Sequence, residues 1–265
     1  FRPAYDCYEP TIELNGGKTI SIQLKAPIYN VDWEDVKQKI NDKTKMIIIN
    51  TPQNPSGTIF SEADMLQLQQ LTEGTNIIIL SDEVYEHIIF DGEKHQSVCL
   101  FSDLKNRSFL TASFGKTFHN TGWKMGYCCA PKELMDEFKK VHQFNVFCVN
   151  HPIQKALAEY LQEPNHYLEL SEFCQEKRDL FLNLIKDSRF KFTASKGTYF
   201  QGLDYSEITL ENDLDFAKRL TIELGIASIP ISVFNENNLD NKMLRFCFAK
   251  TDGTLKKAAE ILNKI

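Results

Sequence analysis

The feature that most constrains the fold is an alternation of short apolar runs with helical stretches through the first two-thirds of the chain. Runs such as 46–49 and 77–80 are far shorter than the roughly 18–20 residues needed to cross a bilayer, and their length suits buried strands. Strands that alternate with helices are the signature of a parallel sheet covered by helices. The sequence therefore predicts an α/β fold, a mostly parallel sheet with helices on both faces.

The expected elements follow from local composition and helix-capping signals. Strands are expected at residues 45–50, 76–80, 108–113, 124–129, 198–203 and 243–249. Helices are expected at 83–89, through most of 132–187, at 213–224 and at 255–263. A further helix is expected to begin at Ser61, because Ser61 and Asp64 have the spacing of a capping box. These patterns predict a large domain at 1–165 and a smaller α+β domain at 166–265.

Composition excludes some classes of protein. The chain has 265 residues, 25% charged, and a net charge of −6 argues against a nucleic-acid binder. The seven cysteines form no CxxC pair, and their odd number fits a reduced cytoplasmic protein. Each is expected to be a buried small hydrophobic side chain. Adjacent Cys128 and Cys129 cannot both point inward from one strand, so one of them should be accessible.

Polar side chains follow three of the strongest predicted strands. Asn50 and Asn54 come after the first of these strands, Asp82 and Tyr85 after the second, and Ser113 with Lys116 after the third. Ligands of open α/β sheets gather at the carboxyl ends of the strands. We therefore expect one polar site assembled from distant parts of the sequence.

The mixture of side chains indicates the ligand. A carboxylate at the end of an apolar strand is costly unless it meets a cation, and a pyridinium N–H would supply one to Asp82. Tyr85 and Asn54 can both hydrogen-bond a phenolate oxygen on the same ring, and Lys116 can form an imine and later shuttle a proton. Each residue alone is a weak signal, since a lysine in a Gly-Lys-Thr turn is usually only solvated. The joint order and spacing carry the prediction.

Six segments together resemble class I/II (fold type I) aminotransferases that depend on pyridoxal 5′-phosphate (PLP), and most closely the kynurenine, glutamine and methionine aminotransferase branch. They run in family order from one end of the chain to the other: Pro3–Pro10, Asn50–Gly57, Ser81–Glu86, Ser113–Phe118, Thr121–Gly126 and Met243–Lys250.

The resemblance implies cofactor roles residue by residue. Lys116 would form the Schiff base and shuttle protons, and Asp82 would pair with the pyridine nitrogen. Tyr85 and Asn54 would hold the ring oxygen O3′, and Tyr5 would stack on the ring.

The remaining roles concern the phosphate and the substrate. Ser113 and Lys124 would bind the phosphate, Arg245 would clamp the substrate α-carboxylate, and Asn50 would lie near that carboxylate. The strand pattern supports Arg245 independently, because 244, 246 and 248 share one face and Arg245 points to the other. A planar guanidinium suits a bidentate carboxylate grip.

The activity implied is a ping-pong transamination between an L-amino acid (methionine, glutamine, or an aromatic or kynurenine-like one) and a 2-oxo acid. The family's two-fold dimers imply a homodimer. The cysteines indicate the cytoplasm, the net charge and the short apolar runs argue against nucleic-acid and membrane partners, and no metal is expected.

Three alternatives to an intact aminotransferase exist. A P-loop is rejected because the glycine it needs five residues before Gly115 is Leu110. A cysteine-conjugate β-lyase would use the same lysine, aspartate and arginine; release of pyruvate and thiol without an amino acceptor would identify it. In the family, a Gly-rich phosphate segment and an intersubunit tyrosine lie upstream of the match that begins at Pro3, and this sequence lacks them. It is therefore expected to be a fragment or a molecule with a crippled site, and an inactive aminotransferase fragment is the third alternative.

Overall fold

The computed structural model describes all 265 residues, and they form two compact units. Unit 1 consists of Phe1–Lys39, Gln53–Ile59 and Phe173–Ile265, and unit 2 of Ile40–Pro52 and Phe60–Glu172. The linear division into domains 1–165 and 166–265 stays a prediction. The units differ from it because residues 1–39 and 53–59 group with the C-terminal part of the chain.

Unit 2 is built on a four-stranded sheet in the order β1-β2-β3-β4. Its strands are β1 (Met46–Asn50), β2 (Ile78–Asp82), β3 (Ser108–Ser113) and β4 (Gly126–Cys129). The first three are parallel and β4 is antiparallel to β3. Ile49 in β1 and Ile79 in β2 are fully buried, which explains the continuous apolar runs in the sequence. The predicted α/β class with a mostly parallel sheet is confirmed.

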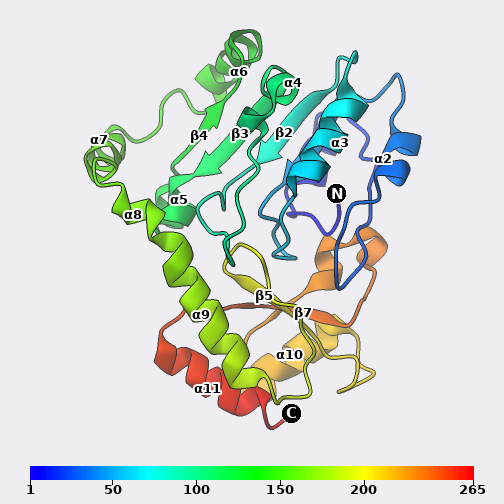
Figure 1. Cartoon of the computed structure of the whole chain (residues 1–265), viewed down its shortest axis with the longest axis vertical. Helices are drawn as coiled ribbons and strands as arrows, with labels where there is room; N and C mark the ends of the chain where they lie inside the picture. The colour runs from blue at the N-terminus through cyan, green and yellow to red at the C-terminus, as the bar shows by residue number, and fades with distance from the viewer. The chain divides into compact units, whose positions relative to one another are not determined.

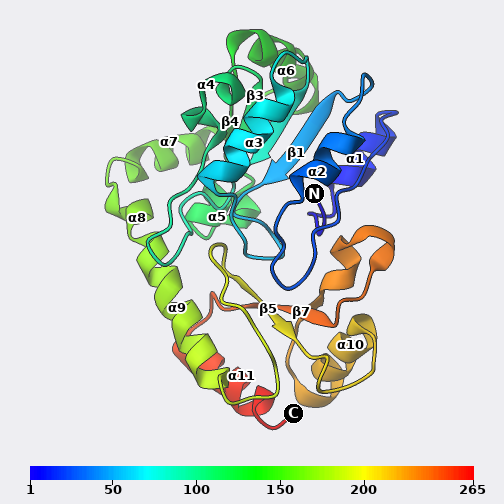
Figure 2. The same ribbon diagram turned by 45° about the vertical axis from the view of Figure 1, so that its right-hand side comes forward.

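Helix α3 (Glu62–Thr72) lies across one face of this sheet (Figures 1 and 2). Ser61 caps it as expected: the Ser61 hydroxyl accepts from the Asp64 amide at 3.2 Å, and the Asp64 carboxylate accepts from the Ser61 amide at 2.9 Å. The helix buries Met65 and Leu68 completely. The other helices of the unit are α4 (Ser102–Lys105), α5 (Phe114–Thr117), α6 (Lys132–Asn145), α7 (His151–Tyr160) and α8 (Asn165–Leu168).

Two local predictions in unit 2 are wrong. Residues 83–89 form successive turns rather than a helix, with the Glu86 amide donating to the Glu83 carbonyl at 2.9 Å and the Ile88 amide to the Tyr85 carbonyl at 2.8 Å. Lys124 is not in a strand: it adopts a left-handed φ of 56° just before β4.

The cysteine prediction is also largely wrong. Of the seven, only Cys174 is buried, and all are free thiols. Cys128 is half-buried and Cys129 is exposed, as expected for neighbours on opposite faces of a strand. Composition alone overestimated how many of these thiols a core would enclose.

Unit 1 contains a three-stranded antiparallel sheet in the order β5-β7-β6. Its strands are β5 (Phe200–Asp204), β6 (Ile229–Pro230) and β7 (Met243–Cys247), and its helices are α1 (Tyr8–Leu14), α2 (Trp33–Lys39), α9 (Leu170–Ile185), α10 (Asp213–Leu224) and α11 (Asp252–Leu262). Helix α10 has the predicted bounds, with Asn212 as its cap and Gly225 ending it in a left-handed conformation.

Aromatic side chains form the core of unit 1. Phe190 lies 6.4 Å, centroid to centroid, from both Phe216 of α10 and Phe246 of β7. Phe181 of α9 packs on Phe246 at the same centroid distance. Helices α9 and α11 lie beside each other (Figure 1), and Nζ of Lys177 in α9 lies 2.5 Å from Oδ1 of Asp252 in α11. No helix of the chain has both the length and the apolar character needed to cross a membrane.

Candidate active site

Asp82 occupies the end of β2, between the two neighbouring parallel strands. Its backbone is paired with Asn50 of β1 on one side and with Thr111 of β3 on the other. The Asp82 carbonyl accepts from the Asn50 side-chain amide at 2.8 Å and from the Thr51 amide at 3.1 Å. Its carboxylate oxygen Oδ1 accepts from the Val84 amide at 3.2 Å. Both the backbone and the side chain of Asp82 are therefore held in place.

Lys116 enters the same end of the sheet from β3. The strand ends at Ser113, whose hydroxyl caps α5 by accepting from the Lys116 amide at 3.3 Å. Lys116 is half-buried, and its Nζ lies 5.8 Å from the centroid of the Tyr85 ring. Tyr85 is itself only 2% exposed. The structure thus brings together the predicted amine and phenol from two strand ends.

A close approach of backbone segments brings Lys124 toward this turn. A Cβ on Gly115 would lie 2.9 Å from the Cα of Thr121, so only glycine fits there. The Gly115 amide donates to the carbonyl of Met125 at 3.4 Å. Lys124, directly before Met125, is exposed and has a positive φ, a conformation uncommon outside glycine that is often found at functional sites.

Arg245 lies on β7 of unit 1, on the face that the alternation predicted. Leu244, Phe246 and Phe248 are buried and Arg245 is half-buried. Its guanidinium carbon lies 4.0 Å from the centroid of the Phe200 ring and 5.1 Å from that of Phe234. A guanidinium against aromatic faces keeps a fixed plane, which favours a planar partner such as a carboxylate.

Asn54 meets Arg245 within unit 1. Its side-chain oxygen accepts from Arg245 Nη1 at 2.5 Å, and Asn54 is 9% exposed. Asn54, predicted to bind the cofactor, and Arg245, predicted to bind the substrate, are 191 positions apart in the sequence and are thus hydrogen-bonded to each other.

The turn that carries Asn54 is anchored by backbone contacts. The Gly57 carbonyl accepts from the amides of Lys196 and Gly197 at 2.8 and 3.0 Å. Gly57 has a φ of 71°, and a Cβ there would lie 2.5 Å from the Ser195 side chain. The buried Arg178 donates to the Ser195 carbonyl at 2.7 Å. Sequence reasoning missed Arg178, because no spacing rule links a helical arginine to this turn.

The nine predicted site residues divide between the two units. Unit 2 brings together six of them at one end of its sheet: Asn50, Asp82, Tyr85, Ser113, Lys116 and Lys124. Unit 1 holds Asn54 and Arg245 together. It also holds Tyr5, which is 46% exposed and lies edge-on to Tyr8 with the ring centroids 5.9 Å apart.

A second residue missed by sequence reasoning is Glu83. It is fully buried and follows Asp82 directly. Its carboxylate accepts from the Ser81 hydroxyl at 2.8 Å and from the Val98 amide at 3.0 Å, and lies 2.6 Å from Nε2 of His95. An acidic residue directly after an apolar strand is a signal in the sequence, but no local pattern identifies its partners.

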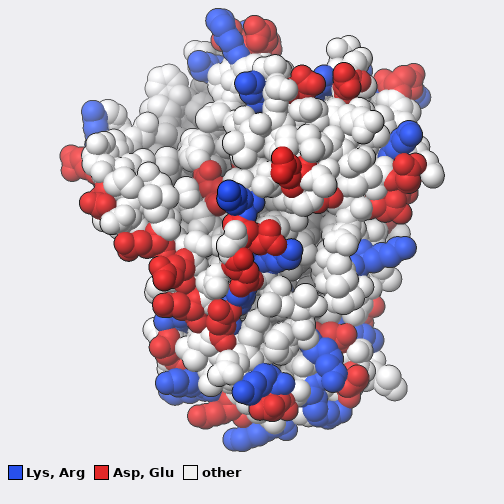
Figure 3. All heavy atoms as spheres, viewed as in Figure 1, with Lys and Arg blue, Asp and Glu red and all other residues white.

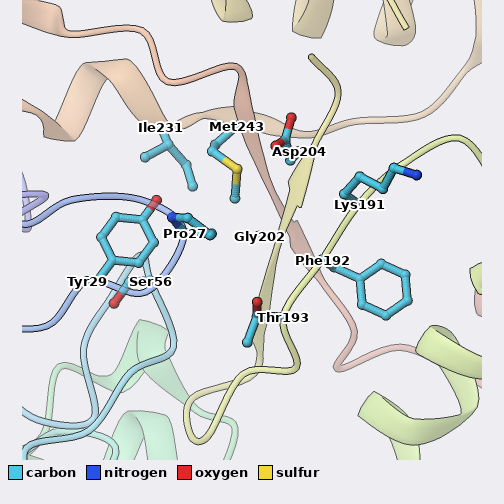
Figure 4. A pocket seen from close by; sticks show the side chains of 10 residues that line it. All are labelled: Pro27, Tyr29, Ser56, Lys191, Phe192, Thr193, Gly202, Asp204, Ile231 and Met243. Carbon is cyan, nitrogen blue, oxygen red and sulfur yellow. The ribbon is translucent and has the colours of Figure 1, made fainter. Parts of the chain in front are cut away.

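Unit 1 also contains a hollow of about 120 Å³ that none of the predicted site residues lines (Figure 4). Tyr29 contributes to its wall, and burial together with the charge of Asp204 raises the pKa of Tyr29 to about 12. The lining residues are Pro27, Tyr29, Ser56, Lys191, Phe192, Thr193, Gly202, Asp204, Ile231 and Met243.

The surface over α8 and α9 is acidic. Figure 3 shows acidic side chains gathered there, and the exposed residues of this segment include Glu163, Glu169, Glu172, Glu176 and Asp179. This face carries no continuous basic stripe of the kind that binds a phosphate backbone.

The side chains fit a pyridine-aldehyde phosphate cofactor. An amine for the aldehyde, a carboxylate for the ring nitrogen and a phenol for the ring oxygen all stand at the carboxyl end of one sheet. The hydroxyl of Ser113 and the exposed amine of Lys124 are groups that bind phosphate. Fold and site together define a cofactor-dependent α/β enzyme.

Comparisons with known proteins identify the class. The family model "Aminotransferase class I and II" matches residues 1–262. Methionine aminotransferase of Escherichia coli K12 is 44% identical over 100% of this chain and 69% of its own length. Kynurenine–oxoglutarate transaminase 3 of Homo sapiens is 31% identical over 98% of this chain and 64% of its own length.

Solved structures of aminotransferases match the fold of this chain. The Escherichia coli protein YbdL, whose structure and reactivity identified a methionine aminotransferase function, matches with a TM-score of 0.98 and 44% identity over 100% of this chain and 70% of its own. N-succinyldiaminopimelate aminotransferase of Mycobacterium tuberculosis matches with a TM-score of 0.94 and 28% identity over 99% of this chain and 70% of its own.

The chain belongs to the class I and II aminotransferases, which are PLP-dependent enzymes. It spans 64–70% of the length of the relatives named above. The predicted family, fold type, cofactor and reaction class are confirmed.

Proposed function

We propose that the enzyme transfers the amino group of methionine, glutamine or an aromatic or kynurenine-like amino acid to a 2-oxo acid by a ping-pong reaction. The observation that carries the proposal is the Arg245 guanidinium, which is held against Phe200 and hydrogen-bonded to Asn54. It is a preorganised site for a carboxylate, the group that every amino and oxo acid shares. The 44% identity to a methionine aminotransferase supports methionine as a first substrate to test.

In this proposal the residues of unit 2 hold the cofactor. Asp82 pairs with the ring nitrogen, Tyr85 donates to O3′, and Ser113 and Lys124 bind the phosphate. When bound, PLP supplies an aldehyde that condenses with amines and a ring that accepts the electron pair of the substrate Cα–H bond. Asn54 is also assigned to O3′, and Tyr5 to stacking on the ring.

Lys116 moves the proton. Its Nζ would take the proton from the substrate Cα and deliver it to the aldehyde-derived carbon of the cofactor, on the other side of the shared nitrogen. Asp82, as a carboxylate, keeps the ring nitrogen protonated during this transfer. The hydrogen bonds to the Asp82 backbone and to its Oδ1 keep the carboxylate aligned, so little reorganisation is needed in the transition state.

Arg245 holds the substrate α-carboxylate, with Asn50 near the same group. The Asn50 amide also donates to the Asp82 carbonyl, so Asn50 contributes to both the cofactor and the substrate side.

We further propose a cytoplasmic homodimer. Seven free cysteines, an odd number without a disulfide, support the reduced compartment, and family membership supports the dimer.

An amino-acid panel tests the substrate. The purified enzyme with PLP is assayed against all common amino acids and kynurenine, with one 2-oxo acid as acceptor, and the new amino acid is quantified. We expect the highest kcat/KM for methionine, glutamine or an aromatic amino acid. Preference for aspartate, or pyruvate and thiol released from a cysteine conjugate without any acceptor, would contradict the proposal.

A further inference from the structure

The turn that presents Asp82 and Tyr85 is tied down by a buried carboxylate between them. Glu83 has no exposed surface, although ionisable side chains are almost never fully buried unless they are paired. Its Oε1 accepts from the Ser81 hydroxyl at 2.8 Å and from the Val98 amide at 3.0 Å. Its Oε2 lies 2.6 Å from Nε2 of His95. Three groups that can donate therefore surround one carboxylate.

The hydrogen-bond inventory assigns the proton positions. The Val98 amide can only donate, and the Ser81 hydroxyl is free to donate, so the network satisfies an ionised Glu83 whose partner His95 carries its proton on Nε2. Nδ1 of His95 is buried and has no hydrogen-bond partner.

This network links the turn after β2 to residues 95–98. The Glu83 amide donates to the Thr111 carbonyl of β3 at 2.8 Å, which fixes the start of the turn on the sheet. The Glu83 side chain then fixes the same turn to residues 95–98, where Val98 is fully buried. Because residues 83–89 form turns rather than a helix, no regular backbone ladder holds Tyr85 in place. The hydrogen bonds of the Glu83 side chain hold this turn in place instead.

We propose that the pair of buried Glu83 and half-buried His95 is a positioning element for the reaction, which fixes the turn that carries Asp82 and Tyr85. The proposal rests on the assignment of Asp82 and Tyr85 to the cofactor under Proposed function. Neither Glu83 nor His95 touches the reacting atoms. They act by positioning Asp82 and Tyr85. Residues that hydrogen-bond to the ligands of a metal site orient those ligands in the same way.

The test compares PLP binding and the visible spectrum in matched variants. His95→Leu removes the donor to Glu83, while His95→Gln keeps a side-chain N–H that can reach the same oxygen. Ser61→Ala removes the cap of α3 and serves as the control, because it lowers stability within the same unit without touching this network. The dissociation constant of PLP is measured by titrating the apoenzyme, and the visible cofactor band is titrated with pH.

We expect His95→Leu to weaken PLP binding by about 10-fold to 100-fold, by analogy with outer-shell residues at metal sites, and to shift the pH midpoint of the visible band. His95→Gln restores most of the affinity, and Ser61→Ala lowers only the unfolding temperature. If His95→Leu does not fold, Glu83→Gln, which keeps the side-chain volume, is expected to change both readouts in the same direction. Variants that lose thermal stability but keep the PLP affinity and the midpoint would overturn the proposal.

Asp82→Ala separates the two levels of inference. If it loses PLP affinity while the His95 and Glu83 variants do not, only the positioning role fails. If Asp82→Ala itself binds PLP normally, the assignment of the cofactor site fails.

Discussion

The end of the unit 2 sheet and the arginine face of unit 1 hold their functional side chains in different ways. In unit 2, Asp82 is fixed by strand pairing, by hydrogen bonds to its backbone and by a bond to its own carboxylate. In unit 1, Arg245 projects from an antiparallel strand and is oriented by two aromatic rings and one amide oxygen. The first arrangement leaves little freedom to the functional group; the second fixes mainly the plane of a long side chain.

This difference matches the difference in the tasks that we propose. Proton transfer and ring electrostatics depend on positions within fractions of an ångström, so a rigid strand-end scaffold suits them. Gripping a carboxylate depends on a planar fork, which tolerates small shifts as long as its orientation is kept. Changes at the sheet end should therefore mainly lower kcat, and changes at the arginine face should mainly raise KM.

The largest effect is expected for Lys116→Ala. Without Nζ there is no covalent attachment and no proton shuttle, so kcat should fall by more than about 10⁴-fold and the visible band of the lysine-bound cofactor should disappear. Turnover assays and absorbance spectra measure both. Lys105→Ala, an exposed lysine at the end of α4, is the control and should behave as the unmodified enzyme. Retained turnover in Lys116→Ala would refute its role.

Asp82→Ala should have the second-largest effect. We expect kcat to fall by about 10²–10³-fold, or about 3–4 kcal/mol, as for other electrostatic groups that act in the transition state. PLP affinity should fall as well, because the ring nitrogen loses its partner. Single-turnover kinetics with excess PLP separate the two effects. A raised KM with an unchanged kcat would break the proposed division of labour.

Arg245→Lys tests the other side of the comparison. Lysine keeps the charge but loses the planar fork, so KM for both the amino and the oxo acid should rise by about 10–100-fold, or about 1.5–3 kcal/mol, with a smaller change in kcat. Steady-state kinetics for both substrates measure this. Arg189→Lys, whose guanidinium donates only to backbone carbonyls at the surface, is the matched control. A loss confined to kcat would count against a binding role.

The smallest expected effect concerns the turn that carries Asn54. Gly57→Ala and Gly74→Ala both place a side chain at a positive φ, which costs about 1–2 kcal/mol of unfolding free energy. Gly74 has open space around it, whereas a Cβ on Gly57 would meet Ser195 at 2.5 Å. Gly57→Ala should therefore lose about 1–3 kcal/mol more. Urea denaturation of both variants measures the difference, and equal losses would show that the Ser195 contact relaxes freely.

Local signals predicted a large part of the structure. The apolar runs predicted the sites of β1 and β2, the local pattern predicted β3 and α10, and the capping box at Ser61 predicted where α3 begins. The polar residues after the strands were expected to form one site; Asn50, Asp82, Tyr85, Ser113 and Lys116 lie in unit 2, where parallel strands place their carboxyl ends at one edge, whereas Asn54 belongs to unit 1. The expected helix at 83–89 was wrong, because side-chain partners far along the chain stabilise turns there instead.

The sequence by itself determined the family, the cofactor class and the identity of the candidate residues, since each is encoded in short segments whose order needs no knowledge of the fold. Only the tertiary structure decided which residues meet. The bond between Asn54 and Arg245, the anchoring of Gly57 by Arg178 through Ser195, and the burial of Glu83 against His95 all join residues that are distant in sequence or not related by strand or helix spacing. Such contacts depend on how the chain closes its loops, and no local periodicity records that.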